Sequence, residues 1–371
     1  FEDLPFTTWL NDFALPKDSA HLPEHIRASA LLNQAEMILN GTTTFIDIFR
    51  FPDEAAAMAE ISGLRAIFSP QLIDDPVGPG ESFESSLGFI ERWKDRVPGR
   101  IQAWFGPHAM YSCTEPTLRK VGKVARDLGV GIHIHLAETP FEVHWVAERS
   151  GGKTPAEHLD DLIGLDTDVL AAHCIEMTPS DMDLLARTGV GAAHCPTSNA
   201  KLGNGIAKVV EMQARGVKVG LGTDSNMTNN NLDMLEELRM ASLVQKQLLR
   251  DPAVMSSAQS LRLATQGSAD ALGMGHLVGS LEVGKRADVI VVDLSAPHTR
   301  PIVEFGRTNI VEQLVWSANG SDVRDTIVDG KVLMRDRQIQ TLRISDLANQ
   351  VDGPLVDLLK RAGILEKRFA D

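Results

Sequence analysis

The chain has 371 residues, 43% of them hydrophobic and 23% charged, which is typical of a globular protein with one large domain and a smaller appendage. Its formal charge of −14 argues against a nucleic-acid partner, because a phosphate backbone usually requires a cationic face. Three cysteines cannot form a disulfide framework, and no signal segment or apolar run of about 18 residues occurs, so we expect a cytoplasmic protein without a membrane span.

Seven short strand-like segments follow one another in the first two thirds of the chain. They cover residues 43–49, 65–73, 101–110, 131–138, 169–174, 189–196 and 218–224. Helical patterns lie between them, among them 115–128, which Gly129 ends, 178–187, which Thr178 caps, and 231–249. Alternating strands and helices predict an α/β fold with a parallel sheet covered by helices.

The composition changes after about residue 277. Residues 281–294 and 322–342 are rich in β-forming residues, and Asp329-Gly330 is a strong hairpin signal. We therefore predict a barrel domain over 1–276, a β-sandwich portion over 277–343 and a helical tail over 344–371.

Four of the predicted strands end in a side chain that can bind a metal or move a proton. These residues are His108, His135 with Glu138, His173 and Asp224. In a parallel barrel, functional groups gather at the carboxyl ends of the strands. A pair of buried histidines and a helix-capping Asp224 are the structural alternatives. Because four strand ends carry such groups together, a catalytic role for these residues is favoured over a structural one.

The remaining histidines and the cysteines give weaker signals. His133 lies deeper in its strand and is interpreted as structural, whereas His194 fits a supporting role in the site and simple packing equally well. Cysteines 113, 174 and 195 lack the spacing of a structural zinc site and are expected to be buried. Histidines 21, 25, 144, 158, 276 and 298 have no companions and are expected at the surface.

Nearly the whole chain resembles the amidohydrolase superfamily, and in particular the methylthioadenosine/S-adenosylhomocysteine deaminases and related chlorohydrolases. The motifs that carry this resemblance are Gly41-Thr-Thr-Thr, GPHAMYS (106–112), HLAET (135–139), AAHC (171–174), HCPTSNAKLGNGIA (194–207), GTDSNMTNNNLDM (222–234) and GSLEVGKRADVIVVD (279–293).

The resemblance implies a TIM-type (β/α)8 barrel with a small β-sandwich and one Zn²⁺ or Fe²⁺ per chain. His135 and Asp224 would be metal ligands. Glu138 would be the proton shuttle, and Asp224 would share with it in taking the proton of the water. His173 would support the attacking water and the metal site. His108 would contact the substrate. Many such barrels pair, so the resemblance is compatible with a homo-oligomer.

The sequence departs from the family pattern in two ways. The HxH motif that ends the family's first strand, and that strand itself, are absent, so we expect a truncated form of an active member whose remaining donors bind metal weakly. At the substrate site, Asp18 stands where the deaminases have a glutamate for the ribose hydroxyls. Thr228 stands where a serine is common.

For the complete enzyme, these features predict hydrolytic deamination of an aminated heteroaromatic ring such as that of adenosine. The alternative within the enzyme class is a triazine-type chlorohydrolase or aminohydrolase. The alternative from another class is an inactive fragment or binding protein without the metal site.

Overall fold

The computed structural model describes residues 3–4, 8–74, 79–304 and 306–364. Each of the seven predicted strand segments contains a parallel strand. The strands are β1 (Thr44–Phe49), β2 (Arg65–Leu72), β3 (Ile101–Ala103), β4 (Gly106–Pro107), β5 (Ile132–Leu136), β6 (Val169–His173), β7 (Gly191–His194) and β8 (Lys218–Leu221). β1, β2 and β3 pair in that order, with β4 also on β2, and β5 to β8 pair in chain order. A bridge between Phe105 and Ile132 joins the two groups.

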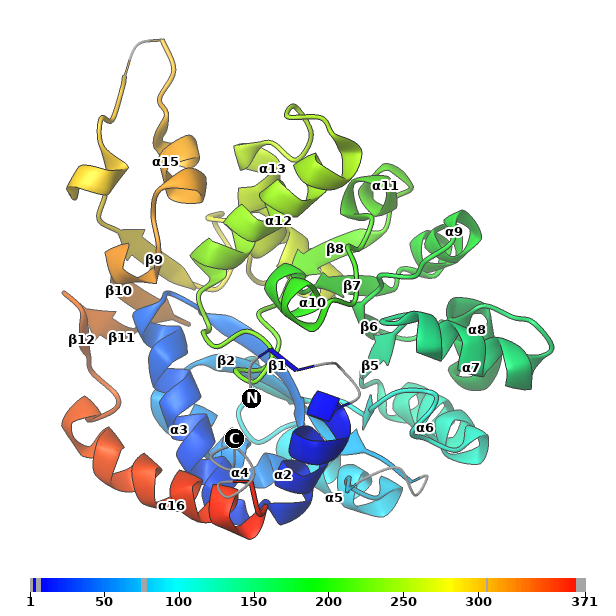
Figure 1. Ribbon diagram of the computed structural model, residues 1–371. Coiled ribbons are helices and arrows are strands. Elements are labelled where there is room, and N and C mark those ends of the chain that lie inside the picture. The colour runs from blue at the N-terminus through cyan, green and yellow to red at the C-terminus, as the bar shows by residue number, and fades with distance from the viewer. Residues whose placement is uncertain (1–2, 5–7, 75–78, 305, 365–371) are drawn as a thin grey trace.

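The helices lie mostly outside these strands (Figure 1), except that α14 belongs to the interior cluster described below. They are α2 (Leu15–Ala20), α3 (Pro23–Leu39), α4 (Pro52–Ser62), α5 (Phe83–Trp93), α6 (Glu115–Leu128), α7 (Pro140–Ser150), α8 (Pro155–Ile163), α9 (Pro179–Thr188), α10 (Pro196–Leu202), α11 (Val209–Ala214), α12 (Met234–Leu249), α13 (Ser257–Arg262), α14 (Ser268–Ala271), α15 (Ile310–Trp316) and α16 (Leu347–Arg361). Helix α6 has the predicted bounds, and Gly129 ends it with φ 64°. Helix α12 begins three residues later than predicted, because Asp233 caps it.

The sheet is curved, as a cluster of side chains from strands far apart in the strand order shows. Ile46 of β1, Ile67 of β2, Leu170 of β6 and Ala193 of β7 pack together with the segment from Ala269 to Val278. A flat sheet in this strand order could not bring β1 near β7. The parallel strands therefore wrap about a common interior.

The end strand β1 of this curved sheet is less buried than its neighbour β2. Every residue of β2 is buried, whereas every residue of β1 is half-buried. Among the residues described, β1 pairs only with β2 and β8 only with β7. The predicted covering of the sheet therefore buries β2 completely and β1 only in part.

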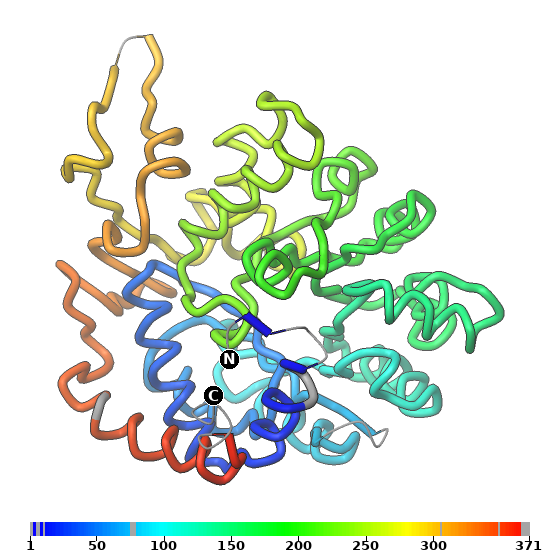
Figure 2. Tube along the Cα trace, viewed as in Figure 1, coloured from blue at the N-terminus to red at the C-terminus, as the bar shows by residue number. Residues whose placement is uncertain are grey.

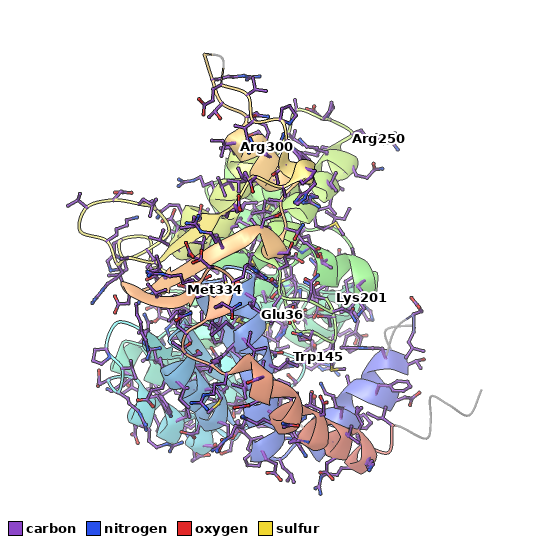
Figure 3. The ribbon with its side chains drawn as sticks, turned by 90° about the vertical axis from the view of Figure 1, so that its left-hand side faces the viewer. Glu36, Trp145, Lys201, Arg250, Arg300 and Met334 are labelled. Carbon is purple, nitrogen blue, oxygen red and sulfur yellow. The ribbon has the colours of Figure 1, made fainter. Side chains whose placement is uncertain are left out.

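A second sheet is antiparallel and joins strands near the end of the chain. Its order is β12 (Gln338–Ile339), β11 (Lys331–Arg335), β10 (Val323–Val328) and β9 (Val289–Val292). The Asp329-Gly330 turn connects β10 to β11, which confirms the predicted hairpin. Helix α16 lies along α3 and α2, so the two ends of the described chain are neighbours (Figure 2). Figure 3 shows Met334 of β11 beside α3, which carries Glu36.

Three histidines predicted at the surface are buried instead. His21, His25 and His158 are each 6% exposed or less. The buried ring of His25 has a partner for each nitrogen. Its Nδ1 accepts from the Leu22 amide, and its Nε2 pairs with Asp357 of α16, a contact between distant segments. The three cysteines are free and buried, as predicted. Within the described ranges, none of the helices has the length and apolar character needed to cross a membrane.

Candidate active site

His135 is the last residue but one of β5, and its ring is held in a defined orientation. Its Nδ1 lies 2.8 Å from the carbonyl oxygen of His108, and its backbone amide donates to the same oxygen at 3.0 Å. A carbonyl only accepts, so Nδ1 carries the proton in the neutral ring and Nε2 keeps its lone pair. Burial lowers the pKa of His135, which favours this neutral form.

Glu138 follows the strand on a turn that a second glutamate fixes. The carboxylate of Glu142 accepts from the backbone amides of Ala137 and Glu138, each at 3.0 Å, and Ala137 has φ 50°. The Glu138 side chain is 12% exposed and lies 3.9 Å from Nε2 of His173. Its Oε1 accepts from Nδ2 of Asn204 at 2.9 Å. The carboxylate is thus held beside an imidazole with little access to water.

His173 ends β6 with φ 71° and stacks on His135, with ring centroids 5.4 Å apart. Its Nδ1 lies 2.9 Å from Oδ1 of Asn199. Burial alone would lower its pKa, but the nearby carboxylates of Glu138 and Asp224 outweigh burial, and the pKa is raised. His173 is therefore the histidine of this cluster that is best suited to hold a positive charge.

Asp224 follows β8 with φ 60°. Its Oδ2 accepts from the Ser198 hydroxyl at 2.5 Å, and its Oδ1 accepts from the Ser225 amide at 2.6 Å. The alternative role as a cap of the next helix does not apply, because Asp233 caps α12. Both carboxylate oxygens are oriented by neighbours at the carboxyl end of the strand.

His108 lies between this cluster and an aromatic pair. Its ring centroid is 4.7 Å from that of His135 and 5.8 Å from that of Tyr111, and Phe141 packs against Tyr111. Nδ1 of His108 bonds to the Ser112 hydroxyl at 2.8 Å, and burial lowers its pKa well below the usual value. The predicted substrate contact is therefore a neutral imidazole.

Asp18 and Thr228, the two other residues predicted to bind the substrate, lie in separate segments. A contact between their neighbours Lys17 and Met227 joins these segments. Asp18 in α2 is 3.3 Å from Nζ of Lys17, and burial raises the pKa of its carboxyl group. Lys17 contacts the sulfur of Met227, which precedes Thr228. The Thr228 hydroxyl donates to the Ser225 carbonyl at 3.1 Å. Helix α2 thus reaches the loop that follows Asp224.

The side chains of His135 and Asp224 are of types that bind a divalent metal ion, but the described residues provide too few ligands for a complete metal site. A neutral imidazole with an oriented Nδ1 and a carboxylate are typical zinc ligands. Among the residues described, however, no three His, Cys, Asp or Glu side chains surround a point closely enough to hold an ion. His135, His173 and Asp224 alone therefore do not form the three-ligand site that a catalytic zinc requires.

The structure adds residues to which the sequence patterns assigned no role. Ser198, Asn199, Asn204 and Glu142 each bond to a predicted site residue or to its backbone. The first three lie in the motif 194–207, which marked the resemblance without indicating function. His194 is 2% exposed, neither ring nitrogen has a hydrogen-bond partner in the described part of the chain, and burial lowers its pKa to about 3.

Known proteins similar to this chain include several nucleoside deaminases. A 5-methylthioadenosine/S-adenosylhomocysteine deaminase of Pelotomaculum thermopropionicum is 42% identical over 342 residues, covering 92% of this chain and 77% of the relative. A 5'-deoxyadenosine deaminase of Methanosarcina mazei is 39% identical over 363 residues, covering 97% of this chain and 82% of the relative.

Solved structures show the same likeness. An adenosine deaminase from Xanthomonas campestris with bound zinc has a TM-score of 0.91 and 31% identity, covering 97% of this chain and 81% of that one. A zinc-bound atrazine chlorohydrolase from Arthrobacter aurescens has a TM-score of 0.84 at 22% identity, covering 95% and 83%, which shows the fold alone. The model of the amidohydrolase family matches residues 1–333. The chain therefore belongs to the amidohydrolase family.

Proposed function

We propose that the protein hydrolytically deaminates the adenine ring of an adenosine-type nucleoside, such as methylthioadenosine or S-adenosylhomocysteine, in the cytoplasm. The observation that carries this proposal is the cluster of His135, Glu138, His173 and Asp224 at the ends of three parallel strands. Relatives at about 40% identity that are named as deaminases support the substrate class. The proposed architecture is a (β/α)8 barrel.

One zinc or iron ion per chain would bind next to His135 and Asp224, with His173 beside it. A divalent metal, when bound, supplies the Lewis acidity that makes water a nucleophile near neutral pH. The zinc bound in the similar adenosine deaminase structure supports this assignment. Since a catalytic site takes about three protein ligands, at least one further ligand must join these residues.

The residues of this chain divide the proton transfers between them. Glu138 takes a proton from the attacking water and delivers it to the ring nitrogen next to the amine-bearing carbon. His173, whose raised pKa favours its charged form, stabilises the oxygen that becomes negative. The second proton of the water, left on the attacking oxygen, passes by way of Asp224 to the amine, so that the carbon–nitrogen bond breaks and ammonia leaves.

Three other side chains would bind the substrate. The neutral His108 would contact the ring, since it lies 4.7 Å from His135 between ring centroids. Asp18 would accept hydrogen bonds from the ribose hydroxyls, and Thr228 would contribute a hydroxyl from the loop after Asp224. Asp18 and Thr228 would thus select a nucleoside over a free base.

A panel of substrates tests this proposal. The zinc-supplemented protein is incubated with adenosine, methylthioadenosine, S-adenosylhomocysteine and a chlorotriazine, and ammonia, chloride and alkylamine are measured. Ammonia from at least one nucleoside, together with about one tightly held metal ion per chain, is the expected result. Chloride or alkylamine release without deamination would favour a triazine hydrolase, and an inactive, metal-free chain would favour a binding protein.

A further inference from the structure

One short segment after β7 contacts three of the proposed catalytic groups at once. It comprises residues 196–204, which we name the α10 segment. Ser198 donates to Asp224 at 2.5 Å, Asn199 pairs with Nδ1 of His173 at 2.9 Å, and Asn204 donates to Glu138 at 2.9 Å; the residues contacted are those proposed for the site. These contacts reach groups that follow three different strands.

The segment is internally braced, so its three contacts are coupled. The Asn204 amide donates to the Asn199 carbonyl at 2.9 Å, and Gly203 makes the intervening turn with φ 69°. Ser198 and Asn199 are 1% exposed or less. The amide of Thr197 lies 3.4 Å from a carboxylate oxygen of Glu237 in α12, which anchors the start of the segment. A shift of the segment would therefore move all three contacts together.

The contacts of Asn199 and Asn204 occupy atoms of His173 and Glu138 that the proposed chemistry does not use. Asn199 takes Nδ1 of His173, and this leaves Nε2 on the side of Glu138, 3.9 Å away. Asn204 takes Oε1 of Glu138, and Oε2 remains to carry a proton. A neutral amide donor orients a carboxylate without adding a charge.

We propose that the α10 segment is a positioning element that fixes Glu138, His173 and Asp224 in one arrangement, with Asn204 setting the orientation of the proton-carrying carboxylate. This inference rests on the proposed deaminase function. Asn204 does not touch the reacting atoms and acts through Glu138, so its loss should reduce kcat and leave substrate binding largely unchanged.

The test uses two variants at Asn204, whose side chain is half-buried. Asn204→Asp keeps the size of the side chain but removes the donor and sets two carboxylates against each other. Asn204→Ala only removes the donor. We expect kcat to fall by about 10–100-fold in Asn204→Ala, the range for partners that orient metal-site residues. A larger fall is expected in Asn204→Asp, with KM within about twofold and an unchanged melting temperature in both variants.

Asn33→Asp in α3 makes the same amide-to-carboxylate change outside this cluster and should retain wild-type kcat. If the wild type is active and both Asn204 variants keep its kcat, or if KM rises while kcat is unchanged, the positioning role is overturned. If the wild type deaminates none of the nucleosides, the proposed deaminase function is wrong, and the inference that rests on it is wrong as well.

Discussion

Several residues in and beside the candidate site, Cys174 with φ 51° among them, have left-handed backbone conformations that cost free energy. Ala137 follows β5 with φ 50°, His173 ends β6 with φ 71°, and Asp224 follows β8 with φ 60°. Such conformations in residues other than glycine cost on the order of 1–3 kcal/mol each and are found disproportionately at active sites. Here they turn the chain sharply at the strand ends. Glu138, His173 and Asp224 can therefore approach one another although they belong to different strands.

Glu138→Gln is the sharpest single test of the proton transfers. Glutamine keeps the shape of the side chain and can still accept from Asn204, but it cannot take a proton from water. We expect kcat to fall by about 10²–10⁴-fold, the usual contribution of a general acid–base group. Deamination rates and metal content measured side by side check this. Unchanged turnover with full metal content would remove Glu138 from the scheme.

Glu237, the anchor of the α10 segment, should make stability depend on pH. It is 1% exposed, and burial raises its pKa from 4.5 to about 7, although it accepts from Asn229 and Thr197. An acid whose pKa is higher in the folded chain stabilises the fold fully below its unfolded pKa, and this contribution disappears as the pH rises through about 7.

The variant Glu237→Gln should therefore lose this pH dependence. Between pH 4.5 and pH 8, the wild type should lose on the order of 2–3 kcal/mol of unfolding free energy relative to the variant. Urea unfolding of both proteins at several pH values measures the difference. Parallel pH curves for the two proteins would show that Glu237 ionises normally in the fold.

Two glycines in neighbouring strands allow another segment to lie directly against the sheet. A Cβ on Gly191 of β7 would lie 2.0 Å from the carbonyl oxygen of Ala271, and one on Gly220 of β8 would lie 2.6 Å from the Cα of Ser268. At these two positions helix α14 therefore packs directly on the strand backbone. This close approach helps to hold β7 and β8, which carry the α10 segment and Asp224.

Gly191→Ala should destabilise the fold, because the new methyl group meets backbone atoms that cannot move independently. We expect a loss of about 1–3 kcal/mol or more in chemical unfolding. Gly88→Ala is the matched control: Gly88 lies inside α5, and its Cβ would meet only the flexible end of Arg92. That variant should gain about 0.5–1 kcal/mol. Equal effects of the two changes would contradict this account of the packing.

The predictability of each element follows from the range of the interactions that determine it. Helix α6 and the Asp329-Gly330 turn have local signals, namely an apolar period with a terminal glycine and a hairpin dipeptide, and both were predicted correctly. The burial of His25 depends on Asp357, more than 300 residues away, and was predicted wrongly. The contacts of Asn199 and Asn204 likewise join different strands, so local patterns gave them no role.

The parallel and antiparallel parts of the molecule are joined by a buried ion pair. Nε and Nη2 of Arg65 in β2 each donate to a carboxylate oxygen of Asp288 at 2.7 Å, and both side chains are nearly inaccessible. Asp288 precedes β9 and also accepts from the Asp329 amide in the hairpin turn. One carboxylate therefore connects the curved sheet, the start of the second sheet and its turn.

Replacing Asp288 by asparagine should test how strongly this pair unites the two parts. The change leaves the guanidinium of Arg65 buried without its full counter-charge, and breaking a buried pair in this way costs about 3–5 kcal/mol. Glu60→Gln is the control, because its partner Arg96 is exposed and such surface pairs contribute about 0–1 kcal/mol. Chemical unfolding of both variants gives the comparison. A loss in Asp288→Asn no greater than in the control would mean that the apolar contacts between α3 and the antiparallel sheet, rather than this pair, hold the two parts together.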